Sequence, residues 1–149
     1  MSIYRKLFYL FLPIILGSLV GFIINGYIDY NSLAKPFLAP PSWIFPVMWS
    51  IIYLLMGISY YIYRKDDEDT IVSIIYYIQL FVNLLWSIIF FVFKFRLFAC
   101  VWIVLLDVFV LFMIYLFWNK KRLSAYLNIP YMLWILFATY LTIGIYLLN

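Results

Sequence analysis

The side chains of this sequence that could do chemistry are aromatic rings and amides rather than the usual catalytic groups. The chain contains no histidine and a single cysteine, Cys100. This composition removes the usual general base, the commonest metal ligand and the usual axial ligand of haem iron. We therefore expect no metal site, no required cofactor and no Ser–His–Asp triad.

Two aromatic side chains near the middle of the chain are candidates for contact with a flat molecule. Trp49 and Tyr53 are four residues apart, so they share one face of a helix. Trp43, at the end of the same apolar segment, fits an interfacial aromatic belt. Trp49 lies about two turns deeper, where rings more often face protein or ligand. The pattern alone leaves the belt and the ligand contact equally open for Trp49.

Polar side chains recur along one face of the next apolar segment. Gln79, Asn83 and Ser87 follow one another at intervals of four residues, which makes a single stripe on a helix. Such a stripe is costly towards lipid and should face the interior of a bundle. Hydrogen bonding between helices explains it more readily than ligand contact does. Trp86, three residues after Asn83, places an indole close to the same face.

The last apolar segment has a comparable face. Tyr131, Trp134 and Ala138 are spaced three and four residues apart and share one side of a helix. The small Ala138 leaves room beside Trp134 for a neighbouring helix or for a flat ligand. Near the N-terminus, Gly17 and Gly21 form a small-xxx-small pattern that allows close backbone approach, either within the chain or between two copies.

Asp107 is the one charged residue inside an apolar segment. An intramembrane acid by default indicates a proton or cation route. No intramembrane lysine, arginine or second acid accompanies it, so a neutral, hydrogen-bonded carboxyl inside a bundle is an equal alternative.

The composition decides the environment of these residues. Hydrophobic residues make up 69% of the 149 residues and charged residues 11%, against about 45–50% and about 25% in soluble domains. A soluble fold could not hide that much apolar surface, so the surplus must face lipid. The net charge of +4 comes from short clusters and not from a basic stripe, so nucleic acid is not an expected partner.

Five apolar stretches are long enough to cross about 30 Å of hydrocarbon as helices. We predict an all-α membrane protein, a single domain of residues 1–149 that forms one bundle. The connection 29–42 contains three prolines, Pro36, Pro40 and Pro41, which hold the backbone near its extended form and suggest a lid over the bundle. The predicted helices cover about residues 7–28, 43–63, 71–93, 99–118 and 125–148.

Basic residues orient the bundle in the membrane. Seven of the ten lie at the end that holds the N-terminus and the second and fourth connections. The positive-inside rule places this end in the cytoplasm. The first stretch is too long for a typical signal peptide and no A-x-A-like site follows it, so we expect it to be retained, which favours a bacterial inner membrane.

Three ordered motifs are similar to those of the translocator protein (tryptophan-rich sensory protein, TspO/MBR) family, in its bacterial form. The second segment resembles K-P-x-x-x-P-P-x-W-x-F-P-x-x-W-x-x-x-Y-x-x-x-G, from Lys35 to Gly57. Gln79 to Phe91 resembles Q-L-x-x-N-x-x-W-S-x-x-F-F, and Pro130 to Leu141 resembles P-Y-x-x-W-x-x-F-A-x-x-L. The resemblance covers nearly the whole chain in register.

The resemblance implies a five-helix bundle that forms homodimers in the lipid bilayer. It also implies a pocket, covered by the first loop, for porphyrins and other flat hydrophobic molecules. By position, the pocket residues of the family fall on Tyr30, Pro40, Trp49, Tyr53, Gln79, Asn83, Trp134 and Ala138. Two features depart from the family. Its acid early in the fourth helix is replaced by Trp102, and no basic residue follows Tyr140 or Tyr146 to make the cholesterol motif of animal members.

Three functions are compatible with this sequence. The first is a binding or sensory protein for tetrapyrroles such as protoporphyrin, in which metal-free porphyrin binds at least as well as haem because histidine is absent. The second is a light-dependent porphyrin-degrading enzyme in which Trp49 and Trp134 are oxidised by the photoexcited ligand. The third is a small-solute transporter that relies on Asp107, although the sequence shows no inverted repeat.

Overall fold

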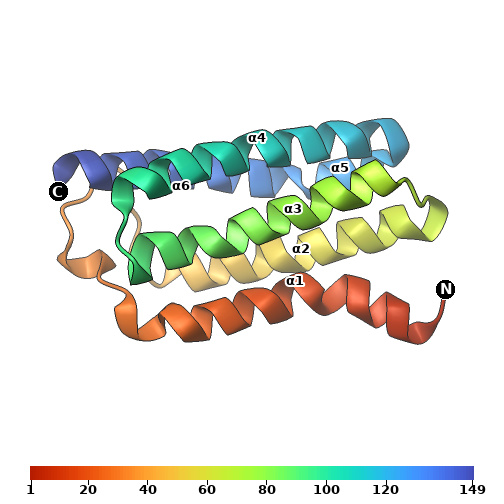
Figure 1. Cartoon of the computed structure of the whole chain (residues 1–149), viewed down its shortest axis with the longest axis horizontal. Helices are drawn as coiled ribbons and strands as arrows, with labels where there is room; N and C mark the ends of the chain where they lie inside the picture. Colours follow the sequence, from red (N-terminus) through yellow and green to blue (C-terminus); the bar gives the residue numbers. More distant parts are fainter.

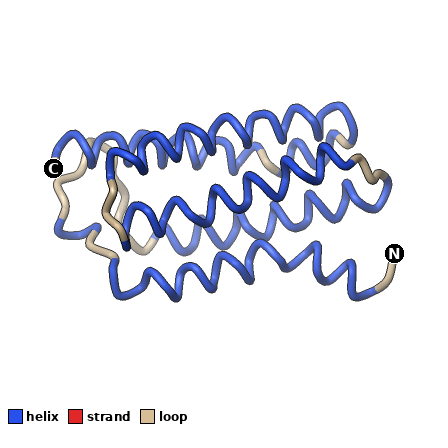
Figure 2. The backbone as a smooth tube through the Cα atoms, in the orientation of Figure 1, coloured by secondary structure: helices blue, strands red, loops and turns tan.

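The computed structural model describes residues 1–149, and all of its regular secondary structure is helical. Five helical spans are long and apolar enough to cross a membrane, which confirms the predicted all-α membrane fold. The helices lie side by side along one axis, and the two termini lie at opposite ends (Figure 1). The connections between the five spans lie at the two ends of the bundle, and one short break interrupts the fifth span (Figure 2). The helices are α1 (Ile3–Ile24), α2 (Ile44–Asp66), α3 (Thr70–Ser87), α4 (Arg96–Lys120), α5 (Arg122–Leu127) and α6 (Ile129–Leu148).

The spans differ from the predicted ranges mainly at their ends. The first span starts at Ile3 and not at residue 7, because the Ser2 side chain caps it by accepting from the Arg5 amide at 3.3 Å. It continues through a 3-10 turn, Asn25–Tyr27. The third span ends in a π-helical turn, η3 (Ile88–Val92), which apolar periodicity does not reveal.

The fifth span was predicted as one helix over 125–148, and this is wrong at its start. The span begins at Arg122 and is divided into α5 and α6 at Asn128, whose backbone has φ −99° and ψ 0°. Pro130 lies two residues later and has no amide hydrogen to donate to the preceding turn. A break here lets the chain start a new helix with proline in its first turn.

The core is formed by α2, α3, α4 and α6, and α1 lies along one side of it. Only Pro13 and Ile24 of α1 are buried. Figure 1 shows α1 next to α2 and α3, on the opposite side of the bundle from α4. Exposed apolar side chains cover the outer faces of all the long helices, as expected of surfaces that contact lipid.

Two glycines bring α1 against α2. A Cβ added at Gly57 would overlap the carbonyl oxygen of Leu10, and one at Gly17 would overlap the Tyr53 ring. Gly21 is different, because a Cβ there meets nothing within 4 Å. The small-xxx-small pattern of α1 therefore serves close packing within the chain at Gly17, and leaves an open space at Gly21.

Candidate functional site

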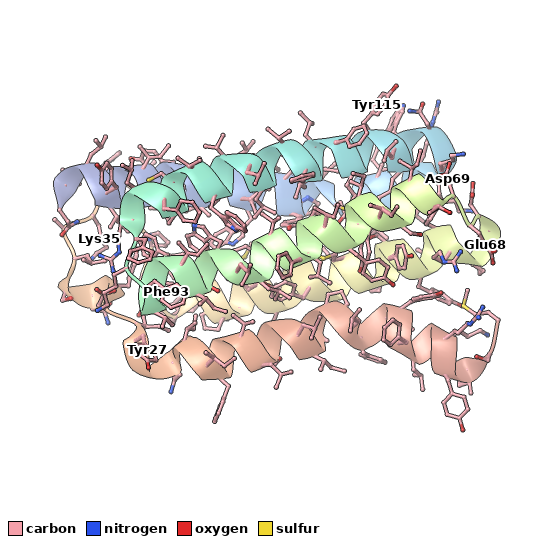
Figure 3. All side chains as sticks on the ribbon, in the orientation of Figure 1. Tyr27, Lys35, Glu68, Asp69, Phe93 and Tyr115 are labelled. Carbon is pink, nitrogen blue, oxygen red and sulfur yellow. The ribbon has the colours of Figure 1, made fainter.

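A cavity of about 610 Å³ lies between α1, α2, α3 with η3, and α6. Residues of the connection 29–42 close it at the end of the bundle that holds Tyr27, Lys35 and Phe93 in Figure 3. No charged side chain lines it, so it suits a molecule whose surface is largely apolar. Its aromatic walls are Tyr30, Trp43, Phe45, Trp49, Tyr53, Trp86, Phe90 and Phe91.

Five of the predicted site residues line this cavity: Tyr30, Trp49, Tyr53, Asn83 and Ala138. The rings of Trp49 and Tyr53 are stacked, with centroids 5.6 Å apart and planes at 27°. This pair results from the four-residue spacing on α2 and presents two ring faces side by side. Ala138 approaches from α6 and Asn83 from α3, so the cavity brings together residues from three motifs that are distant in the sequence.

The other three predicted residues lie just behind the wall. Trp134 is 8% exposed and its ring meets Trp49 edge-on, with centroids 6.3 Å apart. The backbone carbonyl of Pro40 accepts a hydrogen bond of 2.6 Å from the hydroxyl of Tyr30. Gln79 is fully buried. Trp134 and Pro40 contact residues that line the cavity, whereas Gln79 reaches it only through Tyr131, and none of the three lines it.

A chain of hydrogen bonds runs from the cavity wall into the core. The Tyr53 hydroxyl donates to Asn83 Oδ1 at 2.6 Å, and Asn83 Nδ2 donates to the Tyr131 hydroxyl at 2.7 Å. Tyr131 in turn donates to Gln79 Oε1 at 2.7 Å. Gln79 and Asn83 of the polar stripe therefore bond to α2 and α6, as the interpretation of hydrogen bonding between helices predicts, whereas Ser87 donates to the Leu84 carbonyl of its own helix at 3.4 Å. Gln79 Nε2 ends the chain on the Tyr76 carbonyl at 2.9 Å.

One hydrogen-bond donor at the cavity has no partner. The indole nitrogen of Trp86 is buried and unpaired, although Trp86 lines the cavity. A buried donor without an acceptor is costly, and because this nitrogen is itself buried it would meet a bound molecule only if the Trp86 ring turned. The sequence placed Trp86 near Asn83 but did not single it out as a site residue.

Sequence reasoning also missed the contribution of α1. Eight residues of the first span and its extension, between Ile14 and Ile28, line the cavity. The signal was present in Gly17, Ser18 and Gly21, whose small size leaves the space, but the same pattern is equally typical of helix dimerisation.

The connection 29–42 is fixed to the rest of the bundle at several points. Asn149 makes two hydrogen bonds with the Ala34 backbone. Its Nδ2 donates to the Ala34 carbonyl at 2.8 Å, and its Oδ1 accepts from the Ala34 amide at 3.1 Å. The Tyr140 hydroxyl donates to the Phe37 carbonyl at 2.6 Å. Within the loop itself, Lys35 Nζ donates to the carbonyls of Tyr30 and Leu33. These bonds hold the loop across the end of the cavity.

An ion pair fixes the start of this connection. Arg96 Nη2 donates to both oxygens of Asp29, at 2.9 and 2.8 Å, and Lys94 Nζ lies 3.5 Å from Oδ2. Burial alone would raise the pKa of Asp29, but the hydrogen bond and charge of Arg96, with the charge of Lys94, outweigh it and hold the pKa below its ordinary value. Asp29 is therefore ionised at neutral pH.

Asp107 lies apart from this site. Its Oδ2 accepts a hydrogen bond of 2.7 Å from the Thr139 hydroxyl, and its Oδ1 is buried without a partner. It does not line the cavity. A role for Asp107 in handling a solute within this cavity would have to act through other groups.

Comparisons with known proteins agree with the fold and motifs described above. The sequence profile of the TspO/MBR family matches residues 9–148. The chain is 39% identical over 122 residues to the tryptophan-rich protein TspO of Archaeoglobus fulgidus, covering 80% of this chain and 79% of the relative. It is 35% identical over 124 residues to the protein of the same name in Chlorobaculum tepidum, covering 80% and 78%.

A third relative is protein CrtK of Rhodobacter capsulatus, which is 35% identical over 124 residues, covering 80% of this chain and 78% of the relative. The matched region of the profile contains every helix that borders the cavity, apart from the first residues of α1. This chain is an integral, multi-pass membrane protein that belongs to the TspO/MBR family.

Proposed function

We propose that the protein binds tetrapyrroles such as protoporphyrin, and other flat hydrophobic molecules, in the cavity under the connection 29–42. The observation that carries this proposal is an uncharged cavity of about 610 Å³ with aromatic faces on several sides. Stacking and apolar burial would supply most of the affinity for a macrocycle. The Trp86 ring adds a further aromatic face to the cavity wall.

A titration in the dark tests this proposal. The protein in nanodiscs is titrated with metal-free protoporphyrin while tryptophan fluorescence is followed, alongside Trp49→Phe and Trp134→Phe. Trp118→Phe serves as the control, because Trp118 packs on Tyr126 and does not line the cavity. We expect saturable quenching that Trp49→Phe weakens by about tenfold, that Trp134→Phe weakens less because Trp134 acts through its contact with Trp49, and that the control leaves unchanged. Unsaturable quenching, equal in all four proteins, would show that porphyrin only partitions into the bilayer.

Metal-free porphyrin should bind at least as tightly as haem. Tyr30 and Tyr53 are the only side chains lining the cavity that are able to coordinate iron, and both hydroxyls already donate hydrogen bonds, to the Pro40 carbonyl and to Asn83. Coordination would break one of these bonds. A competition titration checks the expectation, and a much tighter affinity for haem would contradict it.

A second candidate function is light-driven breakdown of the bound porphyrin. It is favoured by the contact between the Trp49 and Trp134 rings at 6.3 Å. A photoexcited porphyrin would take one electron from Trp49, and Trp134 would in turn reduce the oxidised Trp49. Dioxygen would add to the porphyrin radical anion, and the peroxyl adduct would return one electron to the oxidised Trp134 and close to a dioxetane, which splits into two carbonyls and opens the macrocycle. Loss of the porphyrin spectrum under light and air, absent in the dark or in Trp49→Phe, would support this function. Light-independent loss would oppose it.

We also propose that the N-terminus faces the cytoplasm and that the protein is a homodimer in a bacterial inner membrane. The orientation is supported by seven of ten basic residues at the N-terminal end of the bundle. Labelling of single cysteines placed at Ser2 and Ala34, with an impermeant reagent on intact cells, tests it, because only the second should react. The mass of the protein in nanodiscs tests the dimer.

A further inference from the structure

The opening of the cavity can be located from the residues that border it. A residue that lines the cavity and is also exposed must lie at its edge. Most of the lining residues are buried or half-buried, including all those from α3, η3 and α6. The exposed ones lie on only two segments, the end of the first span and the start of the second: Ser18, Gly21, Asn25, Ile28, Trp43, Pro46 and Ser50.

The end of the bundle, by contrast, is closed. Tyr30 is 4% exposed and its hydroxyl is bonded to the Pro40 carbonyl, so the loop covers this end of the cavity. The loop is also tied to α6 through Asn149 and Tyr140, and Pro36 packs against Gly144. Opening this end would require several of these contacts to break together.

The side opening lies at a depth where the surroundings are lipid. Ser50 is six residues after the start of α2 at Ile44, which places it ~9 Å along the helix axis. Half of a hydrocarbon core is ~15 Å thick, so the opening extends from the membrane surface into one leaflet. The hydroxyls of Ser18 and Ser50 donate to carbonyls of their own helices at 2.7 Å, so neither is left unpaired towards lipid.

We propose that apolar ligands enter and leave this cavity sideways from the bilayer, between α1 and α2 at Ser18–Asn25 and Pro46–Ser50, and not through the loop. This inference rests on the proposed function, since it requires a ligand in the cavity. Hydrophobic molecules concentrate in the hydrocarbon phase, so a side entrance meets them where they are abundant. The small side chains of Ser18, Gly21 and Ser50 keep the entrance open, and α1, which buries little of itself, can yield as a large molecule passes.

Gly21 offers a direct test. A side chain added there meets no atom within 4 Å of its Cβ, so Gly21→Phe should fold while narrowing the entrance. Gly26→Phe is the matched control, because Gly26 is equally free of neighbours and does not line the cavity. Ser50→Phe narrows the entrance from the opposite edge. Association and dissociation of metal-free protoporphyrin are followed by stopped-flow fluorescence in nanodiscs.

The alternative route is tested by fixing the loop. Cysteines placed at Ala34 and Asn149, where two hydrogen bonds already join the residues, lock the loop when oxidised. The native Cys100 is replaced by alanine so that only this pair can form a disulfide.

We expect Gly21→Phe and Ser50→Phe to slow both association and dissociation of the porphyrin, association by about tenfold. Gly26→Phe and the locked loop should leave both rates unaltered. If the locked loop slows exchange and Gly21→Phe does not, the loop is the entrance and the inference is wrong. If Gly21→Phe weakens the Kd with no change in association, Gly21 borders the bound ligand and the inference is also wrong. Absence of saturable binding to the unmodified protein would instead refute the proposed function.

Discussion

The two halves of this bundle contain similar residues and pack them differently. Towards the N-terminal end, Tyr60 and Tyr76 are stacked with ring centroids 4.0 Å apart, and Tyr9 of α1 meets Tyr60 edge-on at 5.2 Å. Towards the C-terminal end, Trp49 and Tyr53 of the same helix α2 stack at 5.6 Å and border an empty space. One half is filled and the other is hollow.

The difference comes from α1 and not from the aromatic residues. At the filled half, α1 supplies the large Tyr9 ring, and Arg64 adds a hydrogen bond to its hydroxyl at 3.2 Å. At the hollow half, the same helix supplies Gly17, Ser18 and Gly21. Small residues on one peripheral helix thus leave the cavity open, while large residues on the same helix attach it to the core.

The largest loss of stability should come from Gly57→Leu, which disturbs the packing of α1 against α2. Gly57 lies where α1 crosses α2, and any side chain would overlap the backbone of Leu10. The leucine side chain can be accommodated only if α1 moves away from α2, so we expect a loss of about 3 kcal/mol in the free energy of unfolding. Thermal unfolding in detergent measures it.

Gly26→Leu is the control for this substitution, because Gly26 has no neighbour within 4 Å of an added Cβ. It should leave the unfolding temperature almost unchanged. Equal destabilisation by both variants would show that leucine itself, and not the crossing of α1 over α2, causes the loss.

A smaller difference in stability should distinguish the substitution of two buried tyrosines, Tyr131 and Tyr76. The Tyr131 hydroxyl accepts from Asn83 and donates to Gln79, both at 2.7 Å, whereas the Tyr76 hydroxyl is buried without a partner. Tyr131→Phe leaves two polar groups unpaired and should cost about 2 kcal/mol. Tyr76→Phe removes an unpaired group and should be neutral or stabilising. Unfolding temperatures measure both, and equal losses would contradict the assigned hydrogen bonds.

Much of this architecture could be predicted from the sequence because its signals are local. Length and hydropathy predict the five spans, and the spacing of Gln79 and Asn83 predicts a face turned towards other helices, which their hydrogen bonds to Tyr131 confirm. The stacked pair Trp49 and Tyr53 likewise follows from a spacing of four residues on one helix.

The rest depends on which surfaces meet across the bundle, and no local pattern encodes that. Trp134 has the spacing of a residue facing the site, yet its ring lies behind that of Trp49, while Ala138, one turn further along α6, lines the cavity. The break at Asn128 was not predicted because proline is tolerated in the first turn of a helix and also ends helices. Gly21 could equally have faced another helix, so only the assembled bundle shows the open space beside it.

The smallest effect should be an acid-dependent loosening of the loop over the hollow half. Because the folded pKa of Asp29 lies below its ordinary value of 3.8, the stability that its ion pair adds is complete above that value and is lost as pH falls through the lowered pKa. The pair is partly exposed, so its contribution should be under about 1 kcal/mol. Hydrogen exchange of amides 29–42, corrected for intrinsic rates, should therefore be constant above pH 3.8 and increase as the pH falls below that value. Asp29→Asn should show faster exchange already at pH 7 and no further acid step in this loop.

The filled half should keep its own acid response in that variant, because the Asp69 carboxylate, 3.1 Å from Lys120, is untouched. An acid step that persists in the loop of Asp29→Asn would assign it to another group and separate the loop from its ion pair.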